Sequence, residues 1–426
     1  MSFGSLGLCD ELLKTVAEQG YTTATPVQLE AIPAALSQRD VMAVAHTGTG
    51  KTAGFTLPML QLLFGGPAPQ AQTVRALVIT PTRELAAQVA KSVEDYSREL
   101  NIRSGAAFGG VRIEPQIAAL QAGLDVLVAT PGRLIDLYNQ QAVSFDQLEI
   151  LVLDEADRML DLGFIDEISL IQTLLPAKRQ TLMFSATFSK EIKSLAKGML
   201  NDPLLIEVSP ANSTVDTVKQ KLYPVDKERK SELLIHLIQK NKWNQVLVFS
   251  RTKHGADSLV TELESAGIGS ASIHANRTQH ARTNALEGFR EGTVAVLVAT
   301  DIASRGIDVD QLRCVVNFDL PYVPEDYVHR IGRTGRAGTS GLAVSLFSDD
   351  ESKQLKSIER LIGRKLQQDI IPGFAPRKKA ESHPAADEEY GNFEANSKPL
   401  SRGEPRGRRG PDGKPSKKNR NSWRFT

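Results

Sequence analysis

The sequence predicts an α/β protein with two successive parallel-sheet domains and a disordered basic tail. Three observations predict it: short apolar runs alternate with longer helix-like segments, the runs form two series, and the pattern ends near Pro372. Runs that are apolar throughout suit strands buried on both faces, with helices crossing between them. The length of 426 residues agrees, because a single core rarely serves so long a chain.

The candidate strands and the domain boundaries follow from these runs. The first series comprises residues 41–44, 76–80, 125–130, 150–154 and 181–185. The second comprises residues 246–250, 271–274, 294–300, 315–318 and 342–347. Residues 209–215 between them are small, polar and turn-forming, which is typical of a linker. The predicted division is a first domain over 1–208, a linker over 209–217, a second domain over 218–373 and a tail over 374–426.

The composition is that of a globular protein, with 41% hydrophobic and 24% charged residues. No run approaches the ~18 apolar residues of a membrane span, and the N-terminus lacks the basic start and apolar run of a secretory signal. Cys9 and Cys314 lie far apart without a metal-ligand pattern, so they fit core residues in a reducing compartment. We therefore expect a cytoplasmic protein that does not contact membranes.

The positive charge of the chain is concentrated at its end. Residues 398–426 hold ten Lys or Arg and two acids, a balance of +8, and the remaining residues carry 41 bases and 48 acids, a balance of −7. Residues 375–426 are rich in Pro, Gly, Ser, Asn and charge, so they cannot bury enough surface to fold. A solubilising end is one interpretation of this tail, and contact with nucleic-acid phosphates is the favoured one.

A phosphate-binding loop is predicted after the first strand. Its residues are Ala45, His46, Thr47, Gly48, Thr49, Gly50, Lys51 and Thr52, and an apolar helical stretch follows. Glycines let backbone N–H groups converge on phosphate oxygens at the start of a helix. Lys51 would supply a cation for the β- and γ-phosphates of ATP, and the Thr52 hydroxyl would ligate magnesium. Ala45 stands where the general pattern has its first Gly.

The segment from Gly48 to Ala53 also fits a dinucleotide-binding fingerprint. That fingerprint needs an acid about 20 residues further on to hold a ribose. None occurs between Phe55 and Arg83, which disfavours a nicotinamide or flavin cofactor. A chance Gly-rich turn is disfavoured by the strand–loop–helix context.

Paired acids end another apolar run, Ile150-Leu-Val-Leu-Asp-Glu-Ala-Asp157. Ligands bind at the carboxyl edge of open α/β sheets, so the acids are well placed for chemistry. Asp154 suits magnesium, directly or through water, and Glu155 suits orienting and deprotonating an attacking water. The alternative is a solvated acidic strand end, which the preceding Lys51-Thr52 makes weaker.

The residues Asp154-Glu-Ala-Asp157 spell the motif that names the DEAD-box helicases, and the chain resembles that family from Phe3 to about residue 350. The resemblance implies two RecA-like domains, ATP and Mg²⁺ as ligands, and RNA as substrate. It further implies that Gln28 bonds the adenine edge, with Tyr21 and Thr23 nearby. Ser185-Ala-Thr187 is similar to the motif that couples hydrolysis to domain closure.

The resemblance also implies the residues that contact RNA. In the first half they are Pro81, Thr82, Arg83, Gly110, Thr130, Pro131, Gly132 and Arg133. In the second half they are Arg251, Arg282, Thr300 and Arg305. Each motif alone is weak, because a satisfied loop Arg or a turn Gly is the default, and their order along the chain carries the weight.

The second half also carries Tyr327-Val-His-Arg-Ile-Gly-Arg-Thr-Gly-Arg-Ala-Gly338. Arg333 and Arg336 match the family's arginine fingers, which stabilise charge on the γ-phosphate with a bidentate, permanently charged group. By the same resemblance His329 couples to the acidic motif of the first domain, and Asp308 accepts a hydrogen bond from the ribose of ATP.

Three positions depart from the family pattern: His46 replaces Gln, Ala275 replaces Gly, and Ser304 replaces Ala. His46 lies in the phosphate loop, where it bears on nucleotide affinity. The opening residues 2–8, the run 51–58 and the basic tail most resemble the bacterial RhlE-type subgroup.

The resemblance implies an ATP-dependent RNA helicase that pries short duplexes apart with little sequence specificity. Proteins of ribosome assembly or RNA degradation are the expected partners. An ATP-gated RNA clamp and a DNA translocase on the same two domains remain the alternatives. A nucleotide kinase is disfavoured, because it would not explain the arginine run.

Overall fold

The computed structural model describes residues 2–45, 48–208, 218–301, 312–335 and 341–377, and the chain as far as Arg377 forms one compact unit. The predicted linker 209–217 and nearly all of the predicted tail lie outside the described residues. No helix in the described ranges is both long and apolar enough to cross a bilayer.

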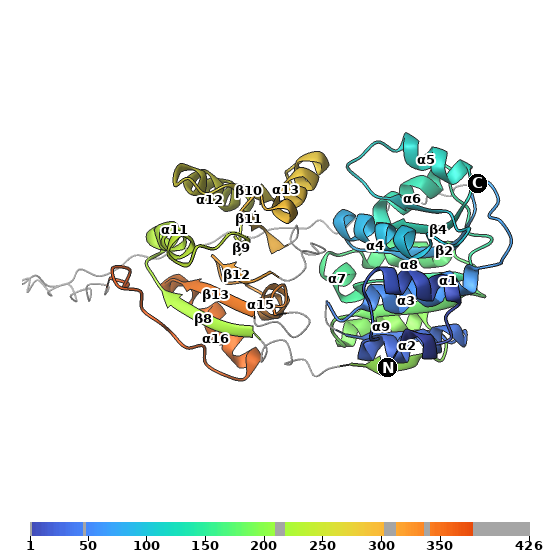
Figure 1. Ribbon diagram of the computed structural model, residues 1–426, viewed down its shortest axis with the longest axis horizontal. Helices are drawn as coiled ribbons and strands as arrows, with labels where there is room; N and C mark the ends of the chain where they lie inside the picture. Colours follow the sequence, from blue (N-terminus) through green and yellow to red (C-terminus); the bar gives the residue numbers. More distant parts are fainter. Residues whose placement is uncertain (1, 46–47, 209–217, 302–311, 336–340, 378–426) are drawn as a thin grey trace, which may run out of the picture. The chain divides into compact units, whose positions relative to one another are not determined.

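The first half forms a seven-stranded sheet in the order β3-β4-β2-β5-β6-β1-β7 (Figure 1). Its strands are β1 (Val41–Val44), β2 (Val74–Ile79), β3 (Ser104–Ala107), β4 (Leu124–Ala129), β5 (Ile150–Leu153), β6 (Gln180–Ser185) and β7 (Leu204–Glu207). Its helices are α1 (Asp10–Glu18), α2 (Pro26–Leu36), α3 (Lys51–Leu63), α4 (Arg83–Tyr96), α5 (Glu114–Gln121), α6 (Pro131–Asn139), α7 (Ala156–Asp161), α8 (Ile165–Leu174) and α9 (Lys190–Met199), and a short 3-10 turn covers Phe3–Ser5.

Helices cover both faces of this sheet, because its central strands are apolar on both sides. In β2, Ala76 and Val78 pack with α1 to α4, whereas Leu77 and Ile79 pack in a second cluster with α6 to α9. The alternation follows from the two-residue period of a strand. The sheet therefore lies between two hydrophobic cores, which fix the positions of its strand ends.

The second half forms a six-stranded sheet in the order β10-β11-β9-β12-β13-β8. Its strands are β8 (Val218–Pro224), β9 (Val246–Phe249), β10 (Ser270–Ile273), β11 (Val296–Ala299), β12 (Cys314–Asn317) and β13 (Gly341–Phe347). Its helices are α11 (Lys230–Asn241), α12 (Lys253–Ser265), α13 (Gln279–Glu291), α15 (Pro324–Ile331) and α16 (Ser352–Ile362), with 3-10 turns at Lys227–Arg229 and Asp349–Glu351. Helices α11 and α12 pack on one face, and α13, α15 and α16 pack on the other.

The predicted fold class is confirmed, and three strands were missed. All three lie at sheet edges: β3 and β7 flank the first sheet, and β8 flanks the second. Their sequences are Ser-Gly-Ala-Ala, Leu-Leu-Ile-Glu with exposed positions, and the alternating Val-Lys-Gln-Lys-Leu-Tyr-Pro. An edge strand is not buried on both faces, so the continuous apolar run that identifies central strands is absent.

Every pairing among these strands is parallel, so the carboxyl ends within each sheet share one edge. The residues that follow β1, β2, β4 and β5 are Ala45, Thr80, Thr130 and Asp154. These are the positions from which the sequence predicts ligand contacts. The fold therefore brings the first-domain motifs together.

A buried ion pair joins the elements at the corresponding edge of the second sheet. The Lys230 ammonium lies 2.6 Å from the Glu351 carboxylate, and each side chain is only 2% exposed. Glu351 also accepts hydrogen bonds from the backbone N–H groups of Leu320 and Ser348 and from the Arg251 guanidinium. One carboxylate thus links α11 to the segments that follow β9, β12 and β13.

Glu351→Gln should destabilise the protein strongly, because it removes the nearer counter-ion of the buried Lys230 ammonium and leaves only Asp319, at 3.7 Å. Loss of one partner of such a pair costs about 3–5 kcal/mol. Denaturant unfolding followed by the fluorescence of Trp243, which packs against the core of the second sheet, measures the change. Glu264→Gln on exposed α12 is the matched control and should stay within about 0.5 kcal/mol of the parent. An equally small change in Glu351→Gln would contradict the assigned role.

Candidate nucleotide and RNA site

The predicted phosphate loop connects β1 to α3. Its glycines Gly48 and Gly50 adopt φ values of 82° and 87°, a left-handed conformation that favours glycine. Helix α3 begins at Lys51 with Gly50 as its N-cap, so the first N–H groups of the helix face the loop. His46 and Thr47 lie outside the described residues.

Gln28 lies against this loop. Its side-chain amide donates to the carbonyl of Gly50 at 3.1 Å and accepts from the backbone N–H of Thr25 at 2.9 Å. A Cβ at Gly50 would collide with the Gln28 amide. The predicted adenine contact and the phosphate loop are therefore one packed unit. Tyr21 and Thr23, which were predicted beside Gln28, are exposed.

Lys51 and Asp154 form the centre of the site. Both side chains are buried, and the Lys51 Nζ and one Asp154 carboxylate oxygen have no hydrogen-bond partner among the described residues. Burial raises the pKa of Asp154 to about 7, the Lys51 charge opposes this rise, and Glu155 adds to it. A buried ammonium and a buried carboxylate with open bonding capacity fit the phosphates and the cation of a nucleotide.

Glu155 occupies a strained backbone position directly after Asp154. It is the N-cap of α7 with φ 55° and ψ 52°, a left-handed conformation that is uncommon for a residue with a side chain. The next acid, Asp157, accepts hydrogen bonds from the N–H groups of Arg158 and Ala186, both at 3.0 Å. Asp157 thus connects the acidic motif to the predicted coupling motif at the end of β6.

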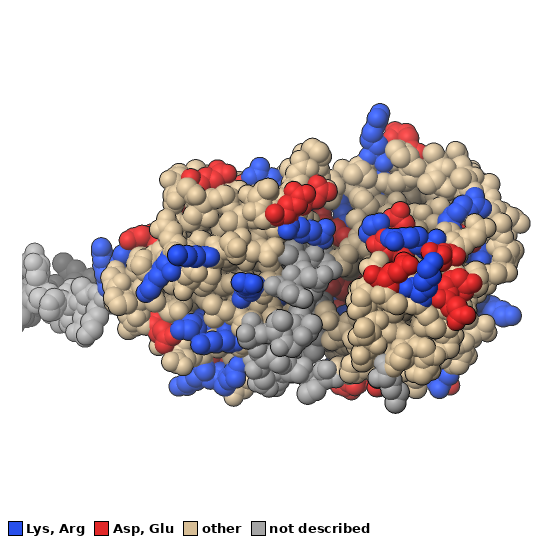
Figure 2. Space-filling model, viewed as in Figure 1, with Lys and Arg blue, Asp and Glu red and all other residues tan. Residues whose placement is uncertain are grey.

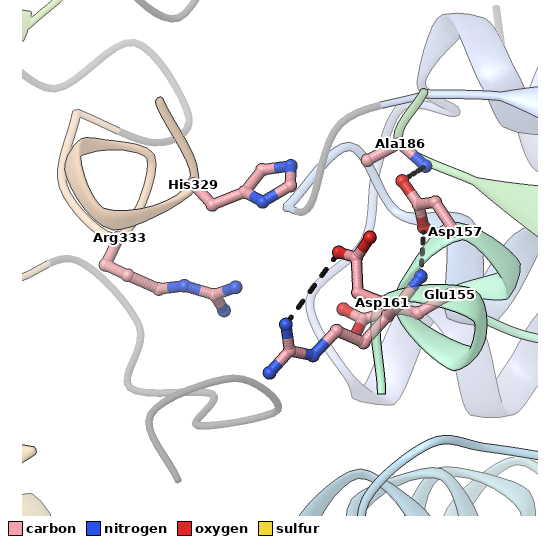
Figure 3. Close-up of a pocket in the computed structure, with 7 residues that line it drawn as sticks. Glu155, Asp157, Asp161, Ala186, His329 and Arg333 are labelled. Atoms are coloured by element: carbon pink, nitrogen blue, oxygen red, sulfur yellow. Dashed lines mark hydrogen bonds and ion pairs between the residues drawn. The ribbon is translucent and has the colours of Figure 1, made fainter. Parts of the chain in front are cut away.

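A small cavity lies beside these acids, as Figure 3 shows. The volume that the centre of a water molecule can occupy in this cavity is about 20 Å³, which is enough to hold one ordered water. Its lining residues are Glu155, Asp157, Arg158, Asp161, Ala186, His329 and Arg333. The predicted pair His329 and Arg333 is therefore brought to the predicted acids.

Burial shifts the proton affinities of the groups around this cavity. It lowers the pKa of His329 to about 4, so the imidazole is neutral at pH 7. It also lowers the pKa of Arg158 to about 10, while nearby acids, Glu155 first, act in the opposite direction. Two guanidinium nitrogens of Arg158 have no hydrogen-bond partner in the described part of the chain. Arg158 and Asp161 were not predicted, although they directly follow the acidic motif.

Helix α15 carries His329 near its end, with Arg333 just beyond it, and a buried arginine anchors the helix. Arg330 is bidentate to Asp301, with distances of 2.6 and 2.8 Å, and donates to Asn317 and to the carbonyl of Asp319. The anchor fixes α15 to the strand ends of the second sheet. Arg336, Asp308 and Arg305 lie outside the described residues.

A larger groove of about 610 Å³ lies among the predicted RNA-contacting residues. The predicted RNA residues that line it are Pro81, Thr82, Arg83, Thr130, Gly132, Arg133 and Arg282. Gly110 lies next to this set, since a Cβ there would meet the Arg83 guanidinium. Arg133 is held by Gln116 and by the carbonyl of Val111.

Of the predicted RNA residues that the structure describes, four do not line the groove: Gly110, Pro131, Thr300 and Arg251. Thr300 follows β11 at the strand edge. The Arg251 guanidinium forms an ion pair with Glu351 at 2.7 Å and lies over the ring of Tyr322.

Glu84 also lines the groove, and the sequence analysis did not single it out; the same holds for Asp136, Leu162 and Phe164. Its carboxylate forms a largely buried ion pair with Arg282 at 2.8 Å and accepts from the Gln279 amide at 3.1 Å. Burial lowers the pKa of Arg282, and Glu84 opposes this shift. The only sequence signal that could have identified Glu84 was its position directly after the predicted RNA residue Arg83.

Comparison with known proteins agrees with this geometry. The chain matches the DEAD/DEAH box helicase family over residues 25–195 and the helicase conserved C-terminal domain over residues 229–338. It is 42% identical over 376 residues to the ATP-dependent RNA helicase RhlB of Pseudomonas syringae pv. tomato, a match that covers 87% of this chain and 95% of the relative. It is 41% identical over 371 residues to the DEAD-box ATP-dependent RNA helicase CshA of Bacillus cereus, covering 87% and 70%.

Among solved structures, S. cerevisiae Dbp5 bound to RNA and ADP BeF3 is similar, with a TM-score of 0.78 and 31% identity. The match covers 88% of this chain and 95% of that one. The two family matches fall on the first and the second sheet respectively. The chain therefore belongs to the DEAD-box family of ATP-dependent RNA helicases.

Proposed function

We propose that this chain uses ATP binding and hydrolysis to unwind or remodel RNA duplexes and RNA–protein complexes locally. One observation carries the proposal: Lys51 and Asp154 are buried together with bonding capacity that no described residue fills. Buried charges are normally paired, so this arrangement is suited to a ligand that carries both anionic phosphates and a cation.

The first domain is proposed to bind ATP. Gln28 bonds the adenine, with Tyr21 and Thr23 beside it. The backbone of the loop holds the phosphates through Ala45, His46, Thr47, Gly48, Thr49 and Gly50, and Lys51 neutralises them. The start of α3 lies at this loop, so the partial positive charge of its N-terminus favours phosphate binding.

Thr52 and Asp154 are the proposed magnesium ligands, and the ion would neutralise charge on the phosphates. Glu155 orients and deprotonates the attacking water, as its place beside a cavity for one water supports. Catalysis is then positional and electrostatic, without a covalent intermediate.

The second domain is proposed to complete the site. Arg333 and Arg336 stabilise negative charge on the γ-phosphate, and Asp308 accepts from the ribose. His329 is neutral at pH 7, so it links to the acidic motif by hydrogen bonding rather than by charge. Its neighbour Arg330 anchors the helix that presents these groups.

RNA is proposed to bind along the groove through phosphates and 2′-hydroxyls, which predicts little sequence specificity. The proposed contacts are Pro81, Thr82, Arg83, Gly110, Thr130, Pro131, Gly132, Arg133, Arg251, Arg282, Thr300 and Arg305. Arg251 and Arg282 form ion pairs with Glu351 and Glu84, so RNA phosphates would exchange with these carboxylates.

The finer assignments are part of the same proposal. They place the domains at 1–208 and 218–373, joined by a linker at 209–217 and followed by a basic RNA-tethering tail at 374–426. They also include a cytoplasmic location, partners in ribosome assembly or RNA degradation, and the RhlE-type subgroup. The relatives reported above carry the names RhlB and CshA, so the subgroup rests on residues 2–8, 51–58 and the tail.

Glu155→Gln should abolish ATP turnover and leave ATP binding intact, because the amide cannot accept the water's proton. Steady-state ATPase assays at fixed salt, with single-stranded RNA and with matched DNA, measure turnover, and a fluorescent nucleotide measures binding. Glu264→Gln on α12 is the control.

In the parent, strong stimulation by RNA alone supports the helicase. Equal stimulation by DNA would favour a translocase, and stable RNA binding without strand separation would favour a clamp. RNA-stimulated turnover retained in Glu155→Gln would contradict the assigned role.

Asp154→Asn should raise the Mg²⁺ concentration needed for half-maximal turnover at least tenfold, because a neutral amide is a weaker magnesium ligand. A Mg²⁺ titration at saturating ATP measures the shift, and excess chelator should stop turnover of the parent. Asp166→Asn on the exposed surface of α8 serves as control and should not shift the curve. An unchanged titration in Asp154→Asn would remove Asp154 from the metal site.

Arg133→Gln should weaken RNA binding about tenfold with similar effect on different RNA sequences, because a phosphate contact carries no base information. Fluorescence anisotropy with several oligonucleotides measures the affinities. ATP affinity without RNA is the internal control and should not change. A loss confined to one RNA sequence would instead indicate base recognition.

A further inference from the structure

A single-sign basic surface lies on α16, far from the groove. The inward face of this helix packs Leu355, Ile358 and Ile362 into the core of the second sheet. Its outward face presents Lys353, Lys356 and Arg360, spaced three and four residues apart so that they share one side of the helix. Arg364 and Lys365 follow the C-cap and are also exposed.

We call these five side chains the α16 basic face: Lys353, Lys356, Arg360, Arg364 and Lys365. Residues 352–365 contain these five bases and one acid, Glu359, whose carboxylate accepts a hydrogen bond from the N–H of Leu366. In Figure 2, Lys and Arg side chains gather over the region of α16 and β8. Like charges at this spacing repel each other slightly, so these side chains do not contribute to the stability of the fold.

Another charged helix of the chain shows the contrast. On α4, Lys91 pairs with Glu94 at 3.2 Å and with Asp95 at 3.0 Å, and Arg98 pairs with Asp95 at 3.0 Å. That mixed pattern is typical of a solvated face whose charges compensate one another. Residues 352–365, in contrast, hold five bases against the single acid Glu359, and this excess of positive charge indicates a polyanionic partner.

The α16 basic face is separate from the RNA groove. The residues of the second half that line the groove are Ala275 and Arg282. Ala275 lies just after β10, and Arg282 lies on α13. Helix α16 packs with β8, at the opposite edge of the six-stranded sheet. Five strand spacings of about 4.8 Å separate these edges, roughly 24 Å. A short strand held in the groove would not reach α16, whereas a duplex arm extending from that strand would.

We propose that the α16 basic face is a second RNA-binding surface that holds the phosphate backbone of a duplex arm outside the groove. This inference deepens the proposed function and rests on it. A duplex is the favoured occupant because its phosphates form a dense and rigid row of charge, and double-stranded RNA is recognised by shape and backbone. The sequence supports this partner, since the basic residues 398–426 follow this face in the chain after the intervening residues 366–397.

The test compares two RNAs on the full chain: a short single strand that fits the groove, and the same strand extended by a duplex arm. Lys356→Glu/Arg360→Glu should reduce the preference for the arm-bearing RNA about tenfold. It should also flatten the slope of log affinity against log salt for that RNA by about 1.5 to 2. Lys240→Glu/Lys242→Glu on exposed positions of the same domain makes an equal charge change and is the control.

An unchanged preference in the α16 variant, or an equal loss in the control, would overturn the proposal. A photoreactive residue in place of Lys353 provides a second measurement if the charge-reversed protein folds poorly. Crosslinks to the duplex arm support the surface. Crosslinks only to protein, including the acidic residues 387–389 of this chain, would overturn it. ATPase stimulated by the short strand in the unmodified chain tests the proposed function separately.

Discussion

The parallel pairing of the strands is the constraint on which this molecule depends. Because every strand of a sheet points the same way, the backbone leaves all of them at one edge, and helices must return the chain across the faces. Residues far apart in sequence, such as Lys51, Asp154 and Ser185, are therefore neighbours by topology. The close-packed apolar strands make this edge rigid, so the polar side chains on it keep their positions even where they are buried.

The polar edge of each sheet is stabilised differently. In the second sheet the buried charges are paired: Lys230 has Glu351, and Arg330 has Asp301. In the first sheet the central ammonium and carboxylate have bonds left unmade by the described residues. Paired buried charges fix a geometry, whereas a buried charge with unmade hydrogen bonds favours a bound ligand. This difference supports the proposal that the first sheet binds the nucleotide and that the second sheet holds its arginines in place.

Much of the fold and many residues of the candidate site could be predicted from two kinds of segment. Strands buried on both faces are apolar throughout, and the candidate site segments combine glycines, charged residues and hydroxyl groups in recognisable patterns. The central strands were identified by their apolar runs, whereas the edge strands β3, β7 and β8 were not, since partial exposure removes that pattern. The phosphate loop was predicted from its strand–loop–helix context, and the acids were predicted from their position directly after an apolar strand. The contact of Gln28 with Gly50 and the pairing of Arg282 with Glu84 depend on tertiary packing, which spacing does not encode.

The ion pair between Arg282 and Glu84 has a kinetic consequence. If RNA binds at Arg282 as proposed, a phosphate cannot reach it by simple encounter, because the Glu84 carboxylate must first release the guanidinium. Association would then contain a unimolecular opening step, and the observed rate would level off as the RNA concentration rises. The same carboxylate can recapture Arg282 when the strand leaves, so the pair would shorten the residence of RNA and help the protein to act on many molecules in turn.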